Sequence, residues 1–215
     1  MVWKQSDNAA MTDPSSGDQL IIRDVSVAAG SQTNTISRDM LLAGKKTIGI
    51  PAGALTPTAS SGAAIAVTSE TATNFVNYSV VLFDDGIEEH AFFQFPTPPS
   101  WDAGDFTFDV GWVTANSSAQ DALWGVKLLA RGDGDIFETA YGTEVTIADT
   151  AQGAAGEFAR SDVSAAVTPG GTPAQSDTIL GQITRVASHA SDTLVGDAGV
   201  IDLRLFYTNS FGTDN

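Results

Sequence analysis

The chain has 215 residues, no cysteine, and 26 acidic against 10 basic residues, which gives a net charge of −16. This length suffices for one all-β domain with a full core and an additional arm. So acidic a chain is not expected to bind nucleic acid or an anionic membrane surface, because attraction to phosphate depends on Lys and Arg. The absence of cysteine excludes disulfides, thiol nucleophiles and Cys-based zinc sites.

Residues 1–45 differ from the rest and are predicted to form an N-terminal arm, with residues 46–215 as the folded domain. Residues 8–18 are polar and turn-rich, so they hold too little apolar surface to fold alone. Residues 20–22 and 25–27 favour short strands or docking segments, and residues 38–43 favour a turn or two of helix ended by Gly44. We expect the arm to order on a partner, or else to supply a first strand pair to the main domain. Its candidate anchoring residues are apolar: Trp3, Leu20, Ile21 and Ile22.

From Lys46 onward the pattern is that of strands separated by Gly- and Pro-rich turns, with no long helix. Residues 52–62 are predicted to be a small-residue loop, and residues 157–165 fit either a helical turn or an edge strand. The pattern predicts an all-β fold, an antiparallel β-sandwich of jelly-roll type preceded by an extended N-terminal arm. About eight strands are expected, over residues 47–50, 75–83, 91–95, 105–112, 123–130, 144–148, 178–186 and 200–208.

The densest apolar reserve lies between residues 88 and 112. Phe106, Phe108, Val110 and Trp112 alternate with acidic or small residues, as in a strand with one buried and one solvated face. The acidic residues of this strand, Asp109 among them, are therefore expected on the solvated face rather than as a glycosidase pair.

No motif points to catalysis, and we expect the protein not to be an enzyme. There is no Gly-x-Ser-x-Gly elbow and no phosphate-binding loop that ends in Lys-Ser/Thr. Glu88 and His90 can share a strand face, but one histidine with one carboxylate falls short of a metal signature. We therefore expect neither a bound metal nor a cofactor.

Four residues are candidates for a surface that faces a ligand or receptor. Arg131 and Asp133 enclose a glycine in a tripeptide known from cell-adhesion ligands, and Asp133 and Asp135 begin a run with partial likeness to a calcium loop. An ordinary hairpin loop is the simpler interpretation of that run. Trp101 lies in a Pro-rich connection and is the tryptophan most suited to an exposed role, such as stacking on sugars, whereas Trp112 and Trp124 are expected in the core.

Two stretches resemble phage structural proteins. Residues 1–10, followed by Asp13 and Pro14, resemble the start of virion-anchoring segments in tail-fibre-like proteins of tailed phages. Residues 46–55, with the order of aromatic segments through residue 210, resemble small jelly-roll-like virion structural proteins of aquatic tailed phages. The resemblance implies a location, in the virion after assembly in the host cytoplasm, and brings no catalytic residues.

The function implied by this resemblance is that of a non-enzymatic surface appendage. It would decorate or cement the capsid, or form a short head fibre, as a homotrimer bound to the major capsid protein or to tail proteins. The alternative is a tail-fibre or spike module that recognises a host surface glycan through Trp101, residues 52–62 or residues 131–137.

Overall fold

A computed structural model of the chain describes residues 19–22, 34–37 and 44–209. The chain divides into two compact units, Met1–Gly44 and Lys45–Asn215. In the first unit, β1 (Gln19–Ile22) and β2 (Asn34–Ser37) pair antiparallel, with Leu20 opposite Ile36. The candidate anchoring residue Trp3, the strand expected at 25–27 and the helical turn expected at 38–43 lie outside the described residues.

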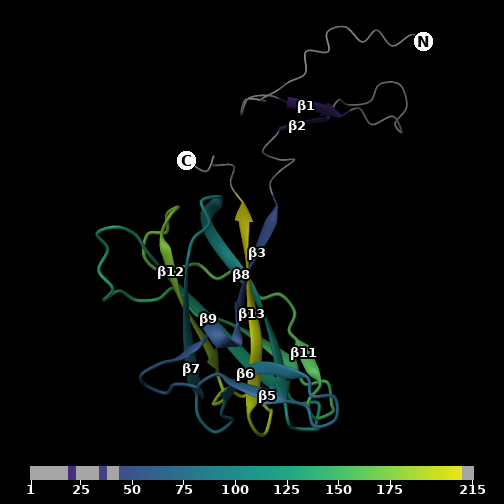
Figure 1. Cartoon of the computed structure of the whole chain (residues 1–215). Helices are drawn as coiled ribbons and strands as arrows, with labels where there is room; N and C mark the ends of the chain where they lie inside the picture. The colour runs from purple at the N-terminus through teal and green to yellow at the C-terminus, as the bar shows by residue number, and fades with distance from the viewer. Residues whose placement is uncertain (1–18, 23–33, 38–43, 210–215) are drawn as a thin grey trace, which may run out of the picture. The chain divides into compact units, whose positions relative to one another are not determined.

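The second unit is a β-sandwich of two antiparallel sheets, drawn in Figure 1. One sheet has the order β10 (Val145–Thr150), β9 (Asp121–Arg131), β12 (Thr178–Arg185), β7 (Glu89–Pro96) and β4 (Thr56–Pro57). The other has the order β11 (Phe158–Arg160), β8 (Trp101–Thr114), β13 (Ala198–Asn209), β6 (Asn77–Phe83) and β5 (Val67–Glu70), and β3 (Lys45–Pro51) also pairs with β13. The predicted all-β jelly-roll sandwich is confirmed.

The aromatic strand lies at the centre of the core, as its alternation predicts. Phe106, Phe108, Val110 and Trp112 on β8 are fully buried between the sheets. Trp112 meets Trp124 of β9 edge to face, with 5.9 Å between ring centroids, so the two sheets are joined through their largest side chains.

Strand β13 keeps its core face only by means of an irregularity. Its register with β8 shifts between Val200 and Asp202, so Val200 and Leu203 both face inward although they are three residues apart. Ile201 lies between them at this irregularity and is only partly buried.

Sequence patterns missed the short strands of the sandwich or left them open between two interpretations. Residues 52–62, expected as a loop, contain a 3-10 helix, η1 (Ala52–Ala54), and the two-residue strand β4. The ambiguous segment 157–165 contains the edge strand β11, which pairs with β8. Strands of two to four residues are too short to show a period, so only their pairing partners define them.

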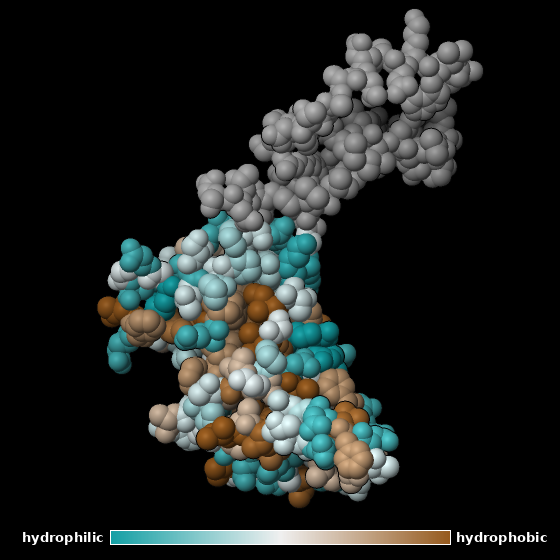
Figure 2. Space-filling model, viewed as in Figure 1, coloured by the Kyte–Doolittle hydropathy of each residue, from teal (hydrophilic) through white to brown (hydrophobic). Residues whose placement is uncertain are grey.

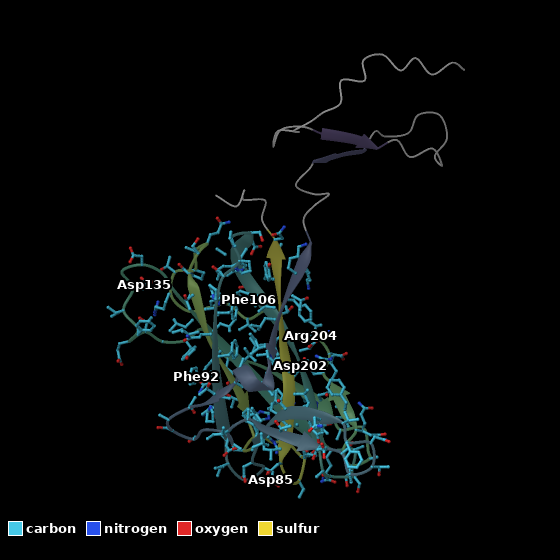
Figure 3. All side chains as sticks on the ribbon, in the orientation of Figure 1. Asp85, Phe92, Phe106, Asp135, Asp202 and Arg204 are labelled. Atoms are coloured by element: carbon cyan, nitrogen blue, oxygen red, sulfur yellow. The ribbon has the colours of Figure 1, made fainter. Side chains whose placement is uncertain are left out.

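The sandwich has two ends that differ in what they carry. Lys45 at the start of β3 lies opposite Thr208 near the end of β13, so the chain enters and leaves the sandwich at one end, here called the proximal end. The β9–β10 loop, residues 132–144, also starts from the proximal end, whereas loops 84–88, 115–120, 151–157 and 186–197 lie at the opposite, distal end. Figure 3 shows Asp135 on the loop of residues 132–144 and Asp85 at the distal end.

Candidate functional site

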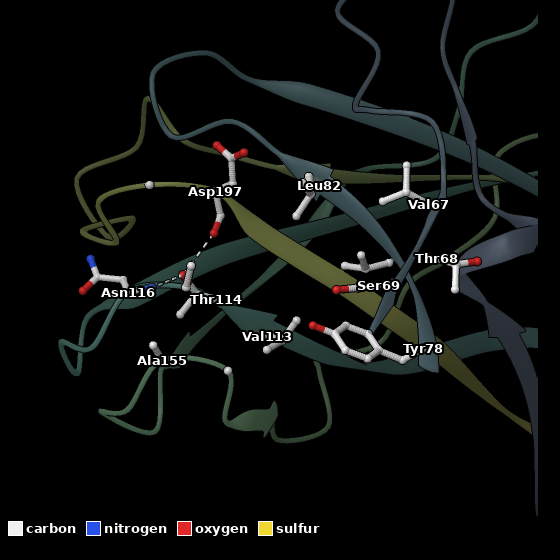
Figure 4. Close-up of a pocket in the computed structure, with 14 residues that line it drawn as sticks. Val67, Thr68, Ser69, Tyr78, Leu82, Val113, Thr114, Asn116, Ala155 and Asp197 are labelled. Atoms are coloured by element: carbon white, nitrogen blue, oxygen red, sulfur yellow. Dashed lines mark hydrogen bonds between the residues drawn. The ribbon is translucent and has the colours of Figure 1, made fainter. Parts of the chain in front are cut away.

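A groove of about 610 Å³ opens on the outer face of the sheet that contains β5, β6, β13 and β8 (Figure 4). Strand β6 pairs with β13 only from Val81 to Phe83, and beyond that point the β5–β6 hairpin leaves β13. The groove lies between this hairpin and the distal loops. Its lining combines strand and loop residues: Val67, Thr68, Ser69, Tyr78, Val80, Leu82, Val113, Thr114, Ala115, Asn116, Ala155, Gly156, Gly196 and Asp197.

The floor of the groove is apolar because β13 carries a glycine there. A Cβ at Gly199 would collide with Val80 and would lie 3.1 Å from Cδ2 of Leu82 and 3.4 Å from Cγ1 of Val113. These three side chains therefore converge over the glycine from the two neighbouring strands, on the face opposite the core. The missing side chain at Gly199 makes the floor possible.

Polar groups stand at both ends of this floor. Ser69 and Tyr78 face each other in the β5–β6 register, and within the described part of the chain neither hydroxyl has a hydrogen-bond partner. At the other end lies Asp197, whose backbone oxygen accepts a hydrogen bond of 3.0 Å from the Thr114 hydroxyl. The Asn116 amide is already engaged, because it donates to Gln120 Oε1 and to the Val195 carbonyl. Within the described residues, the free groups of the groove are thus the hydroxyls of Thr68, Ser69 and Tyr78 and the carboxylate of Asp197.

The distal loop that supplies Gly196 and Asp197 is held by a buried ion pair. Arg185 is fully buried, and its five N–H groups donate to Asp192 Oδ1 and Oδ2 and to the carbonyls of Phe83, Leu194 and Gly196. Every donor of the guanidinium is satisfied, so the burial penalty is offset and the loop is fixed in place. No sequence motif signals this pair, because Arg185 lies in a strand and Asp192 in a loop.

An ionic cluster covers the middle of the same outer face, away from the groove. Arg160 binds Asp109 and Asp202, and Arg204 binds Asp109; Figure 3 labels Asp202 and Arg204 on β13. Burial alone would lower the pKa of Arg160, but the hydrogen bonds and charges of Asp202 and Asp109 raise it. The hydrogen bond from Arg204 to Asp109 raises the pKa of Arg204.

The expectation that Asp109 is solvated is therefore wrong. Its exposed fraction is 2%, because both guanidinium groups cover it and neutralise its charge. The two arginines and the two aspartates of the cluster form ion pairs with one another, so no carboxylate of the cluster is left without a partner.

Trp101 does not face a ligand. Its side chain is fully buried and lies 5.1 Å from the ring of Phe106, centroid to centroid, so the prediction of an exposed stacking platform is wrong. The strand expected from residue 105 begins four residues earlier, because β8 already starts at Trp101. Trp112 and Trp124 are buried as predicted.

The predicted cluster around residue 131 is an ordinary loop start. Arg131 is buried, with Nη1 donating to the carbonyl of Ala130 and lying 3.7 Å from Oδ2 of Asp135. Asp135 accepts a hydrogen bond from the Gly132 amide, and Asp133 is exposed. The loop brings Arg131 and Asp135 together, but a buried arginine cannot act as an adhesion ligand.

No metal centre emerges in the part of the chain that the structure describes. Among those residues, no group of three or more His, Asp or Glu side chains is placed to hold a metal ion. Nδ1 of His90 lies 3.0 Å from the Thr184 hydroxyl, and Nε2 lies 3.8 Å from Glu88. Within the same described residues, no helix is long and apolar enough to cross a membrane.

Comparison with known proteins finds likeness in fold alone. The sequence matches no family model and no curated protein. A family 35 carbohydrate binding module from Clostridium thermocellum is 13% identical, with a TM-score of 0.40 over 74% of this chain and 97% of that one. The enzymatically active domain of tailspike protein 4 of bacteriophage CBA120 is 9% identical, with a TM-score of 0.35 over 76% of this chain and 19% of that one.

A cycloisomaltooligosaccharide glucanotransferase from Paenibacillus is 14% identical, with a TM-score of 0.38 over 73% of this chain, and the match spans only 18% of the enzyme. The class of jelly-roll β-sandwich follows from the two antiparallel sheets of this chain and their strand order, and not from these distant likenesses. Fold does not fix function, which has to be argued from the surfaces of this chain.

Proposed function

We propose that the chain is a non-enzymatic structural component of a tailed-phage virion. In this proposal it is a homotrimeric appendage that decorates or cements the capsid, or stands on it as a short head fibre, with residues 1–45 as the anchor. The resemblance of residues 46–210 to small phage virion proteins supports this role.

The observation that carries the proposal is an apolar loop tip at the proximal end. In the loop of residues 132–144, Ile136 is 71% exposed and Phe137 is 75% exposed. Figure 2 shows hydrophobic surface on the loop that projects from the side of the sandwich, where Figure 1 draws this segment. Large apolar side chains displayed together mark a surface for contact with another protein.

The position of this tip suits an assembly contact. The loop lies at the end where β3 begins and β13 ends, so a neighbour bound at the proximal end of the sandwich would meet it. The net charge of −16 opposes association of the surface as a whole, so burial of exposed apolar side chains such as Ile136 and Phe137 is an attraction available to a second copy or to another virion protein.

Light scattering on the full chain tests the trimer. We expect three times the chain mass, and we expect the double variant Ile136→Ser, Phe137→Ser to shift toward monomer. Val195→Ser is the matched control, because Val195 is a similarly exposed apolar residue at the distal end. A wild-type monomer would rule out the homotrimer, and an unchanged mass of the double variant would remove the loop from the interface.

Electron microscopy of purified particles tests the location. Gold-labelled antibody against the protein should decorate intact virions at regular positions on the capsid or its fibres. Absence of the protein from purified virions would end the proposal. Label on the tail alone would replace capsid decoration by the alternative role, a tail-fibre or spike module that recognises a host glycan.

That alternative needs a ligand site outside the proximal end of the sandwich. The groove favours it, because it lies among the distal loops, opposite the end where the chain enters.

A further inference from the structure

The groove between the β5–β6 hairpin and the distal loops has the composition of a small-ligand site. Its floor of Val80, Leu82 and Val113 is apolar, and a few polar groups stand at its ends. Ligand sites in proteins are typically of this kind, with mostly apolar walls that bury the ligand and a few polar groups that orient it.

The charge at the groove disfavours an anionic ligand. None of the described residues that line the groove is basic. The arginines of the described sandwich are all engaged by carboxylates, in the pairs Arg131–Asp135, Arg160–Asp202, Arg185–Asp192 and Arg204–Asp109. The single charge at the groove is the carboxylate of Asp197, which would repel phosphates, uronates and sialic acids.

The groups that remain free match hydroxyl-bearing ligands. Ser69 and Tyr78 each offer a hydroxyl that can donate and accept, and Asp197 can accept from two directions. The Tyr78 ring also lines the groove and can cover an apolar face of a ligand. A sugar ring has both features, since its C–H faces are apolar and its edge carries hydroxyls.

We propose that this groove binds a neutral saccharide, with the Tyr78 ring against a sugar face and with Ser69 and Asp197 bonding sugar hydroxyls at the two ends. The saccharide class follows from the unused hydroxyls and the apolar floor, and its neutrality follows from the missing basic side chains. The inference deepens the alternative role given above and rests on it for its biological meaning, while the homotrimer and the capsid location do not depend on it.

A glycan array probed with the full-length protein tests the inference. The array carries neutral glucans, galactans and mannans beside uronate-containing, phosphorylated and sialylated glycans. We expect binding to one or more neutral glycans and none to the anionic set. For the neutral glycan bound, Tyr78→Ala should weaken binding about tenfold through loss of the ring, and Ser69→Trp should abolish it by filling the groove.

The matched control is Tyr141→Ala, which removes a partly exposed tyrosine from the proximal loop and should leave binding unchanged. Tyr78→Phe separates the ring from the hydroxyl and should retain most of the affinity. Thermal melting of each variant shows whether it is folded, and if Tyr78→Ala is unfolded, Tyr78→Phe and Ser69→Trp decide the question.

Three results would overturn the inference: no binding to any neutral glycan, binding to anionic glycans only, or neutral binding that Ser69→Trp leaves intact. Each of them leaves the light-scattering and virion-labelling outcomes untouched, so failure of the saccharide site is distinguishable from failure of the virion role.

Discussion

The indole Nε1 of Trp112 donates a 2.6 Å hydrogen bond to Oδ2 of Asp149, and this bond joins β8 of one sheet to the edge strand β10 of the other. Burial raises the pKa of the Asp149 carboxyl, the bond from Trp112 partly opposes this shift, and the charge of Asp162 adds to it. This hydrogen bond between the sheets therefore uses the Asp149 carboxylate as its acceptor, although burial disfavours the charged form of that carboxylate.

Two substitutions of Asp149 distinguish the effect of losing the hydrogen-bond acceptor from the effect of losing the negative charge. Asp149→Ala leaves the buried indole N–H without an acceptor and should cost about 1–3 kcal/mol in the free energy of unfolding. Asp149→Asn keeps an oxygen acceptor without the charge and should cost much less. Urea denaturation followed by tryptophan fluorescence measures both, and equal losses for the two variants would contradict this account.

The same carboxyl predicts a pH dependence. Its pKa is raised on folding, so the folded state binds its proton more tightly than the unfolded state does. The contribution of Asp149 to stability is therefore most favourable at low pH and declines as the pH rises from 3.8 through the raised value. The stability of Asp149→Asn relative to wild type should increase between about pH 4 and pH 7. A difference that is constant or falls with pH would show the sign to be wrong.

Removal of the buried guanidinium should be the most damaging single charge change. Arg185→Met leaves Asp192 buried without its partner and frees three carbonyls, so we expect a loss of about 3–5 kcal/mol. Arg204→Ala is the control, because that side chain is 40% exposed and Asp109 keeps Arg160, and we expect about 0–1 kcal/mol. If urea denaturation gives similar losses of unfolding free energy for Arg185→Met and Arg204→Ala, the greater importance of Arg185 is refuted.

Substitution of Trp101 tests whether this residue is part of the core. Trp101→Ala should cost about 3–5 kcal/mol, because it opens a cavity beside Phe106. Phe137→Ala removes an exposed aromatic and should change the stability of the monomer by less than about 0.5 kcal/mol. If Trp101→Ala unfolds at the same denaturant concentration as wild type, the residue is not part of the core.

One glycine in the central strand β12 is required by its neighbour. Gly181 lies opposite Phe93 of β7, and a Cβ at this position would collide with the Phe93 ring, which covers the glycine. Gly181→Ala should therefore cost about 1–3 kcal/mol by displacing the ring. Gly49→Ala is the control, since a Cβ there meets no atom within 4 Å, and the two midpoints in urea should differ clearly.

The fold class and the core strands could be predicted from local sequence patterns alone. The period-two alternation of Phe106, Phe108, Val110 and Trp112 marks a buried strand face, because apolar burial at every second residue leaves no other solution for a strand. Trp124 was placed in the core by the same argument. The negative charge argues against binding to nucleic acid, and the absence of cysteine excludes disulfides and thiol nucleophiles.

The burial and the partners of the polar side chains follow from contacts between distant segments. Asp109 looks solvated along its own strand, but two arginines from β11 and β13 cover it. The groove is likewise made by residues more than a hundred positions apart, with Ser69 and Tyr78 from one hairpin and Asp197 from a distal loop. Local patterns report which face of a strand is buried, whereas contacts between distant segments depend on strand order and register, which a single sequence does not encode in any short window.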